Sequence, residues 1–336
     1  MTLDQNSATP VVLVCGMPRS GTTLLMLMLD SHPQGLMPRG RVLQTTADRW
    51  ILGVSNYHEL DKFLDQLYTS DYLHRPPRSS QQDLRAVLQP HLPLTYQSLI
   101  ERLNFHDASI QPDSDFFWGE KTSELIWKWD ILKSTLDNPR LVIVLRDGRA
   151  ILSSLLKAHS TAGLETNLYQ WATDYNNFSK RVVALLNEPN VNVIRYEDLV
   201  NQPLPVLQNL SSFLGIQYHS DMLRYTHKAG RFTNDPKRGM HKLIQEDPHA
   251  GRGIAWQQEL SPHIIRISNH LIHESLATWN YSALPTLLKK STIRVKIESL
   301  QYKTALNLYL ALKYKMPSSR SSRFFLRLEK FIGYHV

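Results

Sequence analysis

The sequence predicts an α/β fold, in which a P-loop-type, doubly wound parallel sheet is flanked by helices. Two short apolar runs, 10–15 and 141–145, are rich in β-branched residues, as expected of strands buried on both faces. Each run is followed by a glycine-bearing turn and a stretch with helical spacing, and this alternation is typical of a doubly wound sheet. The 336 residues, 42% of them hydrophobic and 20% charged, suffice for one large globular domain or two smaller ones.

The turn after the first predicted strand has the spacing of a phosphate-binding loop. Residues 16–23 read Gly-Met-Pro-Arg-Ser-Gly-Thr-Thr, which fits Gly-x-x-x-x-Gly-Lys-Ser/Thr except that Thr22 replaces the lysine. That lysine reaches the β- and γ-phosphates of a bound triphosphate. A helix over Thr22–Asp30 would direct its N–H groups and its dipole at an anion, and Arg19 adds a guanidinium suited to oxyanions. The loop therefore predicts a phosphate or sulfate ligand other than a triphosphate.

The second apolar run leads into a similar arrangement. Arg146 leaves the strand end, Gly148 forms the turn, and a helix predicted over 150–157 carries hydroxyl groups. In open α/β sheets, ligands bind beyond the carboxyl ends of the strands. Two such loops on one sheet suggest a ligand that is charged at both ends.

Weaker patterns place the remaining elements. Residues 116–119 and the alternating run 191–196 are predicted strands. A helix is expected over 204–214, ending at Gly215, and another over 262–278, with Ser261 as its N-cap and Pro262 at its first position.

Two segments lie outside this pattern. Residues 48–115 are polar and helical, and we expect an insertion that caps the sheet and shapes an acceptor site. The segment 284–336 carries eleven basic residues against two acidic ones, a net charge of +9 that leaves about −1 for the rest of the chain. Apolar side chains interleave with these charges, which suits an anionic membrane surface, an acidic partner or a docked helix pair with a solvated basic face. No nucleic-acid-binding motif accompanies the charge, so a nucleic-acid partner is not expected.

Cysteine usage and hydropathy indicate the compartment. Cys15 is the single cysteine, which excludes a disulfide framework and a cysteine-ligated metal site within one chain and favours a reducing compartment. The N-terminal residues lack the pattern of a signal peptide, and no stretch is apolar enough to span a bilayer. These features predict a cytoplasmic enzyme. Its basic segment would allow it to associate with a membrane surface.

Three segments together resemble the sulfotransferases that use 3′-phosphoadenosine 5′-phosphosulfate (PAPS). They are Pro18–Leu24, Leu145–Ala150 and Arg195–Leu199, and the likeness extends over about 11–281. The most similar branch includes tyrosylprotein sulfotransferases and many bacterial enzymes. The resemblance implies a sulfotransferase domain over about 8–283 that transfers a sulfuryl group from PAPS to an acceptor hydroxyl or amine by in-line displacement.

The resemblance also implies how the donor is held. The 5′-phosphosulfate would contact the first loop, and the 3′-phosphate would contact Arg146 and Ser154. Tyr196 would lie near the nucleotide, and a late loop would close over it. The implied donor-binding residues are Arg19, Ser20, Gly21, Thr22, Thr23, Arg146, Ser154, Tyr196, Arg252 and Gly253. PAPS has no γ-phosphate, so neither the missing lysine nor a metal ion would be needed, and the product would be 3′-phosphoadenosine 5′-phosphate (PAP).

The catalytic residues are only partly matched. Lys121, in a Gly-Glu-Lys-Thr segment that recurs in the family, would act as the electrostatic catalyst on the bridging oxygen or sulfuryl group. The glutamate that acts as general base in several relatives is missing, because Gly40 stands near its expected position, between Arg39 and Arg41.

Three candidates for the base remain. Glu120 is favoured over Asp48, and a histidine would serve if the two arginines bind an acidic acceptor. On position alone, His32 and His159 are expected to be structural.

Two rival functions remain open at this stage. One is a P-loop nucleotide phosphotransferase or kinase, which the missing lysine disfavours. The other is an inactive, nucleotide-binding member of the family that is tethered through its basic segment. The acceptor is open among carbohydrate, lipid, peptide tyrosine and small metabolite.

Overall fold

The computed structural model describes residues 10–38, 42–69, 77–110, 116–162, 166–228 and 251–281. The chain divides into two compact units. Unit 1 comprises 1–145, 185–234 and 242–248, and unit 2 comprises 146–184, 235–241 and 249–336. The basic segment 284–336 lies outside the described residues, so the division of the chain into a domain of 8–283 and a tail stays a prediction.

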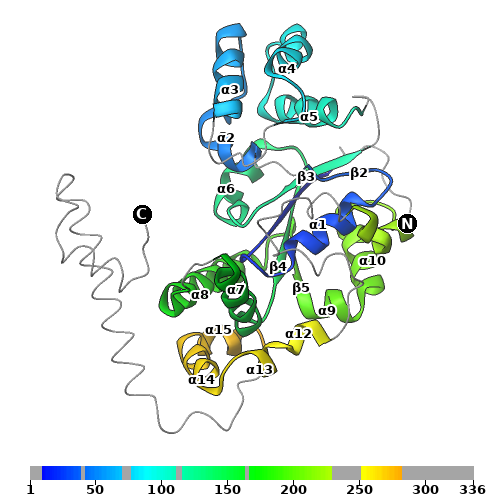
Figure 1. Cartoon of the computed structure of the whole chain (residues 1–336). Helices are drawn as coiled ribbons and strands as arrows, with labels where there is room; N and C mark the ends of the chain where they lie inside the picture. The colour runs from blue at the N-terminus through cyan, green and yellow to red at the C-terminus, as the bar shows by residue number, and fades with distance from the viewer. Residues whose placement is uncertain are drawn as a thin grey trace, which may run out of the picture. The chain divides into compact units, whose positions relative to one another are not determined.

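Unit 1 is built on a five-stranded parallel sheet with the order β2-β3-β1-β4-β5 (Figure 1). The strands are β1 (Val11–Gly16), β2 (Gly35–Leu36), β3 (Phe117–Lys121), β4 (Pro139–Leu145) and β5 (Val191–Arg195). Because β1 lies between β3 and β4, the chain extends the sheet first on one side of β1 and then on the other. The predicted doubly wound parallel sheet is confirmed.

Helices pack on the sheet of unit 1 through strand side chains that alternate between its two faces. Val12, Val14, Val142 and Val144 form one buried cluster with helices α1 (Thr22–Asp30) and α10 (Pro203–Leu214), the short helix α9 (Tyr196–Asn201) and the 3₁₀ segment η2 (Ser220–Lys228). Helix α6 (Leu125–Thr135) packs on β1 and β4. Helix α1 has the predicted bounds, and α10 ends at Gly215, whose φ of 72° is left-handed as expected of a helix C-terminus.

Cys15 lies in the interior of this sheet and is fully buried. Burial raises the pKa of its thiol, because the charged thiolate would be desolvated. Cys15 therefore acts as a small apolar residue of the core.

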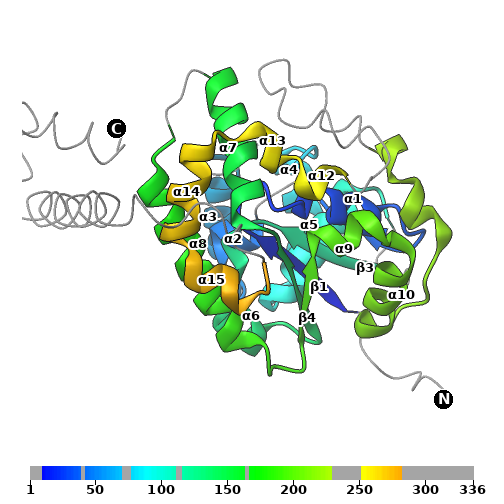
Figure 2. The same ribbon diagram turned by 90° about the horizontal axis from the view of Figure 1, so that it is seen from below.

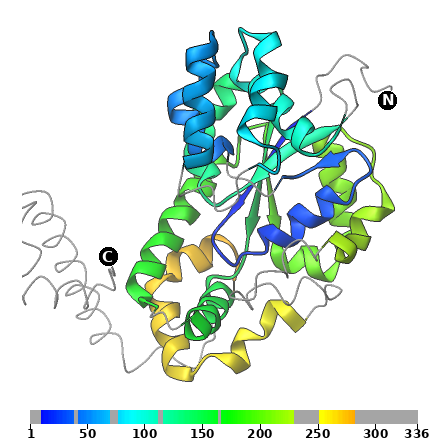
Figure 3. The same cartoon turned by 45° about the horizontal axis from the view of Figure 1, so that its top comes forward.

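The predicted insertion is helical in the part of it that the structure describes (Figure 3). It contains the end of α2 (Val42–Trp50), followed by α3 (Tyr57–Thr69), α4 (Gln81–Leu88), η1 (Gln89–His91) and α5 (Tyr96–Asp107). Ser80 and Asp83 form a capping box at the start of α4. Helix α4 contacts both α3 and α5, so these helices form one layer of unit 1. That they cap an acceptor site stays a prediction.

Unit 2 is helical among its described residues. It contains α7 (Gly148–Ala162), α8 (Leu168–Leu185), α12 (Gly251–Ile254), α13 (Trp256–Glu259), α14 (Pro262–Leu271) and α15 (His273–Thr278). Helices α13 and α14 both pack beside α7 (Figure 2).

The single helix expected over 262–278 is wrong in one respect, because the structure breaks it at Ile272, with φ −119° and ψ 20°. A Cβ atom at Gly148 would lie 2.6 Å from Ile272 Cδ1, so Ile272 is buried against α7. Tertiary packing of this kind overrides helical spacing. The predicted start of the helix is confirmed, since Ser261 Oγ accepts a hydrogen bond from Ile264 N.

Candidate functional site

The loop after β1 adopts the tight turn that its sequence predicts. Arg19 and Gly21 have positive φ values of 73° and 102°, and Ser20 N donates to Met17 O at 3.0 Å. Ser20 is fully buried, yet its Oγ has no hydrogen-bond partner among the described residues. A buried hydroxyl without a partner is rare in folded proteins and often marks a missing ion, water or ligand. The Ser20 hydroxyl lies directly before α1, whose N-terminus has no side-chain cap. A buried hydroxyl beside the N–H groups of a helix N-terminus suits the binding of an oxyanion.

Tyr196 packs against this loop. A Cβ atom at Gly21 would lie only 2.3 Å from Tyr196 Cδ2, so only a glycine leaves room for the ring. At Gly16, a Cβ atom would lie 2.5 Å from Ser20 Oγ and 2.7 Å from Val144 O. Both loop glycines are therefore required by close packing as well as by the turn. The structure brings Tyr196 and the loop together as the sequence suggested, and contact of Tyr196 with a nucleotide stays a prediction.

Lys121 and Glu120 leave the end of β3 on opposite faces of the sheet. Lys121 pairs in register with Val14, which packs in the cluster that contains α1, and Glu120 pairs with Leu13. Because successive side chains alternate along a strand, Lys121 belongs to the face covered by α1, the helix that follows the phosphate-type loop. Adjacency in sequence, which favoured Glu120 as a base beside Lys121, therefore does not place the two groups on one face.

The carboxylate of Glu120 is bound to the start of α2. Glu120 is 5% exposed, and its two oxygens accept hydrogen bonds from Leu43 N at 2.7 Å and Gln44 N at 3.1 Å. Gln44 Oε1 in turn accepts a hydrogen bond from Thr122 Oγ1 at 2.7 Å. These bonds satisfy N–H groups that a helix N-terminus leaves without intrahelical acceptors, and the carboxylate complements the helix dipole. This geometry supports a positioning role, and the assignment of Glu120 as a base stays a prediction.

Asp48, the other carboxylate considered, is 74% exposed on α2 and forms an ion pair with Lys128 at 2.5 Å. Arg39, Gly40 and Arg41, where relatives carry their glutamate, lie outside the described residues.

In unit 2, the structure brings two of the predicted donor-binding residues together. Arg146 Nη2 donates to the backbone oxygen of Arg252 at 3.1 Å, and Tyr175 Oη donates to the backbone oxygen of Arg146 at 3.0 Å. Ser154 lies two turns into α7 and is half-buried. Arg252 is buried in α12, directly before Gly253.

A buried arginine near these residues was missed from the sequence. Arg149 is 2% exposed, and its guanidinium donates to both oxygens of Asp147, with a shortest contact of 2.7 Å. It also donates to Asn269 Oδ1 at 3.0 Å and lies 4.1 Å from the ring centroid of Trp256. Asp147 Oδ1 accepts a hydrogen bond from Arg149 N at 2.8 Å, which caps α7. An aspartate before a glycine is a signal for a helix cap that the sequence shows. No sequence pattern, however, predicts that Arg149 contacts residues more than 100 positions away.

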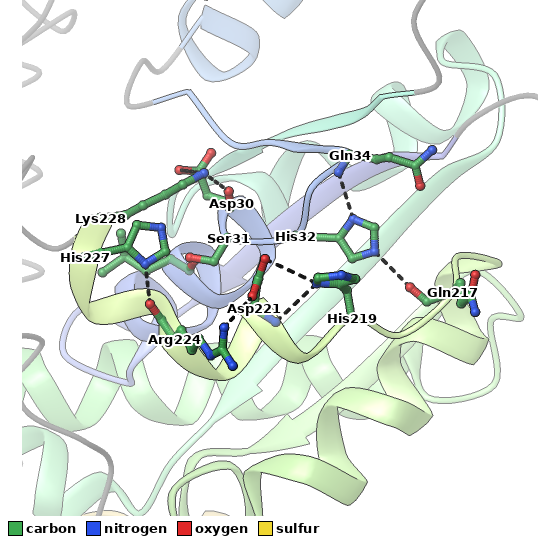
Figure 4. A network of polar contacts seen from close by, with 11 residues as sticks. Asp30, Ser31, His32, Gln34, Gln217, His219, Asp221, Arg224, His227 and Lys228 are labelled. Carbon is green, nitrogen blue, oxygen red and sulfur yellow. Dashed lines mark hydrogen bonds and ion pairs between the residues drawn. The ribbon is translucent and has the colours of Figure 1, made fainter.

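The two candidate histidines form hydrogen bonds within the fold, and their expected structural role stays a prediction. His32 Nδ1 accepts a hydrogen bond from Gln34 N at 3.0 Å, and Nε2 donates to Gln217 O at 2.8 Å (Figure 4). Burial lowers the pKa of His32, and nearby His219 lowers it further. His159 Nδ1 is 2.7 Å from Thr166 Oγ1. Both ring nitrogens of His32 are thus engaged: Nδ1 in the local turn after α1, and Nε2 in holding this turn to the segment before η2.

Among the described residues, no group of three or more His, Cys, Asp or Glu side chains is arranged to hold a metal ion. None of the helices described is both long and apolar enough to cross a membrane.

Known proteins share both the sequence pattern and the fold. The chain is 22% identical over 249 residues to protein-tyrosine sulfotransferase A of Caenorhabditis elegans, covering 67% of this chain and 55% of that protein. It is 26% identical over 186 residues to carbohydrate sulfotransferase 1 of Danio rerio, covering 48% of this chain and 44% of that protein. The chain thus spans about half the length of these curated relatives.

Among solved structures, the sulfotransferase domain from the curacin biosynthetic pathway superposes with a TM-score of 0.54 at 19% identity, covering 82% of this chain and 99% of that domain. This similarity concerns the fold. Residues 10–220, more than half of the chain, match the sulfotransferase family. They include the loop with the buried Ser20 hydroxyl, the Glu120-Lys121 strand end and Arg146. The chain belongs to the sulfotransferase family.

Proposed function

We propose that this protein transfers a sulfuryl group from PAPS to a hydroxyl or amine of an acceptor. The observation that carries the proposal is the loop at 16–23, which keeps the turn, the glycines and the helix N-terminus of a phosphate site but has Thr22 in place of the lysine. The buried Ser20 Oγ, which has no partner among the described residues, supports an oxyanion ligand at this loop. A donor without a γ-phosphate suits such a loop better than a nucleoside triphosphate does.

Donor binding is proposed for residues of both units. In unit 1, Arg19, Ser20, Gly21, Thr22 and Thr23 would bind the 5′-phosphosulfate through backbone N–H groups, hydroxyl groups and one guanidinium. Tyr196, whose ring packs on Gly21, would border the nucleotide. In unit 2, Arg146, Ser154, Arg252 and Gly253 would bind the 3′-phosphate. The contact between Arg146 and the Arg252 backbone supports assigning these two arginines to one group.

Catalysis would depend on charge stabilisation by Lys121. PAPS supplies a sulfuryl group bonded to a phosphate leaving group, and negative charge grows on that phosphate as the bond breaks. An ammonium group fixed at a strand end stabilises such charge without reorganising in the reaction. The assignment of Lys121 to the sheet face of α1 supports this role.

The proton acceptor remains a choice among several groups. Glu120 is engaged with α2, Asp48 is exposed, and His32 uses both ring nitrogens in structural bonds. Glu120 stays favoured over Asp48 as the proposed base, and a group on the acceptor would serve if Glu120 is confined to its positioning role. Relatives are named for acting on protein tyrosine and carbohydrate, so hydroxyl acceptors of these two classes are the first to test. Contact of the basic segment 284–336 with an anionic membrane stays a prediction.

Transfer of radiolabelled sulfate from PAPS tests the proposal. The acceptor panel would contain sulfatable carbohydrates, tyrosine peptides, lipids and phenols, followed by an extract of small molecules. We expect a labelled product and the release of PAP in the presence of EDTA, since the proposed transfer requires no metal. PAP binding without transfer to any acceptor would favour the inactive nucleotide-binding member, and ATP turnover that requires magnesium would favour the phosphotransferase.

A further inference from the structure

Three side chains spaced four residues apart hold α13 against α7. Arg149, Ser153 and Lys157 lie on one face of α7, because a four-residue spacing brings side chains into line along a helix. Arg149 lies over the Trp256 ring, and Ser153 and Lys157 both bond to the carboxylate of Glu259, with Lys157 Nζ at 2.5 Å. Trp256 and Glu259 are the first and last residues of α13, so both ends of this short helix are fixed.

The carboxylate of Glu259 is held in its charged form at this contact. Burial acts to raise its pKa, but hydrogen bonds from Lys157 and Ser153 and the charge of Arg146 outweigh burial and leave the pKa of Glu259 below its usual value. The attachment of α13 therefore persists at neutral pH. Arg149 differs from Lys157 in being buried, and from both other side chains in contacting three partners at once, Asp147, Asn269 and Trp256.

The position of α13 determines that of α12. Only Ala255 separates the two helices, and Ala255 N donates to Gly251 O at 3.1 Å. The backbone oxygen of Arg252 in α12 accepts the hydrogen bond from Arg146 Nη2. The direction of the Arg146 guanidinium thus depends on α12, and α12 depends through Trp256 on Arg149.

We propose that Arg149 is a positioning residue for the 3′-phosphate of the donor. It acts through Trp256 and Arg252 to orient Arg146, and it does not touch the nucleotide itself. This inference rests on the proposed function, since it presupposes that Arg146 binds the 3′-phosphate. An arginine with planar, forked geometry suits this role, because it can bond to Asp147 and Asn269 in its plane while its face stacks on Trp256.

The experiment compares the binding of PAP and of adenosine 5′-monophosphate, which lacks the 3′-phosphate, by calorimetry. The variants are Arg149→Lys, which keeps the charge facing buried Asp147, and Arg149→Met, which removes it. The matched control is Arg140→Met in unit 1, because Arg140 also donates to an asparagine, Asn190, and lies over a ring, that of Phe213. Thermal unfolding of each variant shows whether it is folded.

We expect Arg149→Met to bind PAP at least about tenfold more weakly than the unmodified protein does. Arg149→Lys should also bind PAP more weakly. In both variants, the affinity for adenosine 5′-monophosphate should change by less than about twofold. The control, Arg140→Met, should retain the preference of the unmodified protein for PAP over adenosine 5′-monophosphate. If Arg149→Met does not fold, the binding of PAP and of the monophosphate to Arg149→Lys tests the role of Arg149. Folded variants that keep the preference for PAP, or that lose both ligands equally, would overturn the role of Arg149. A failure of the unmodified protein to prefer PAP would instead overturn the proposed function.

Discussion

Two neighbouring residues of β3 have different environments and, we argue, different tasks. Lys121 lies on the face of the sheet that α1 covers, whereas Glu120 binds the start of α2. The pair illustrates how strand alternation separates residues that the sequence shows side by side. Their roles can be separated by substitution.

Lys121→Ala should lower turnover while leaving the affinity for PAP largely unchanged, because the ammonium group is proposed to act on charge that develops only during transfer. We expect a loss of roughly 100-fold or more in kcat. Steady-state kinetics with PAPS and an acceptor found in the transfer assay measure kcat, and calorimetry measures PAP affinity. Lys128→Ala on α6 is the control for loss of a lysine. Unchanged turnover in Lys121→Ala would remove its catalytic role.

Glu120→Ala should destabilise the fold, because it leaves the N–H groups of Leu43 and Gln44 without their acceptor. The expected loss in the free energy of unfolding is about 1–3 kcal/mol. Asp48→Ala, on the same helix, removes only an exposed ion pair and should cost less than about 1 kcal/mol. Urea unfolding measures both. If Glu120→Ala instead abolished turnover at full stability, Glu120 would have a chemical role and the positioning role would be wrong.

At the scale of the elements, α1 is tied to η2 and the segment before it by a polar network. Lys228 at the end of η2 donates to the backbone oxygen of Asp30 and lies 3.3 Å from its carboxylate, while His32 bonds to Gln217 (Figure 4). His219 and Asp221 lie next to His32 in the same network. This network holds the helix that follows the phosphate-type loop.

The stability of this network should depend on pH. Burial and His219 lower the pKa of His32 in the folded protein, and the bond to Gln217 and the charge of Asp221 offset this only in part. The unfolded chain therefore takes up a proton at His32 at a higher pH than the folded one. The stabilisation is complete above the unfolded value of about 6.5 and is lost as the pH falls from there through the lower folded pKa.

Urea unfolding at about pH 7.5 and about pH 5.5 tests this. The unmodified protein should lose more unfolding free energy between these two values than His32→Gln does. His91→Gln, which alters an exposed histidine on η1, is the control. Equal losses in the unmodified protein and His32→Gln would show that His32 does not carry the pH dependence.

Elements with a local signal could be predicted from the sequence. The continuous apolar runs of β1 and β4, the turn at 16–23, and the caps at Ser261 and Gly215 depend on residues close together in the chain. Two-residue β2 is too short for a pattern, and the break at Ile272 arises from packing against Gly148. The site shows the same difference. The loop residues could be predicted because they are adjacent in the chain, whereas the contacts of Glu120 with α2 and of Arg149 with Trp256 join segments that are far apart in the sequence.

At the scale of the whole molecule, donor-binding residues are proposed in both compact units. The phosphate-type loop and Tyr196 belong to unit 1, and Arg146, Ser154 and Arg252 belong to unit 2. PAPS carries a phosphosulfate at its 5′ position and a phosphate at its 3′ position, and the assignment of one charged group to each set stays a proposal.

Donor binding is tested most directly by calorimetric titration of the whole protein with PAP in EDTA and, separately, with ATP and magnesium. We expect submillimolar binding of PAP without any divalent cation, and much weaker binding of ATP, because Thr22 stands where a triphosphate needs a lysine. Absence of PAP binding at submillimolar concentration, or tight magnesium-dependent binding of ATP, would contradict this expectation.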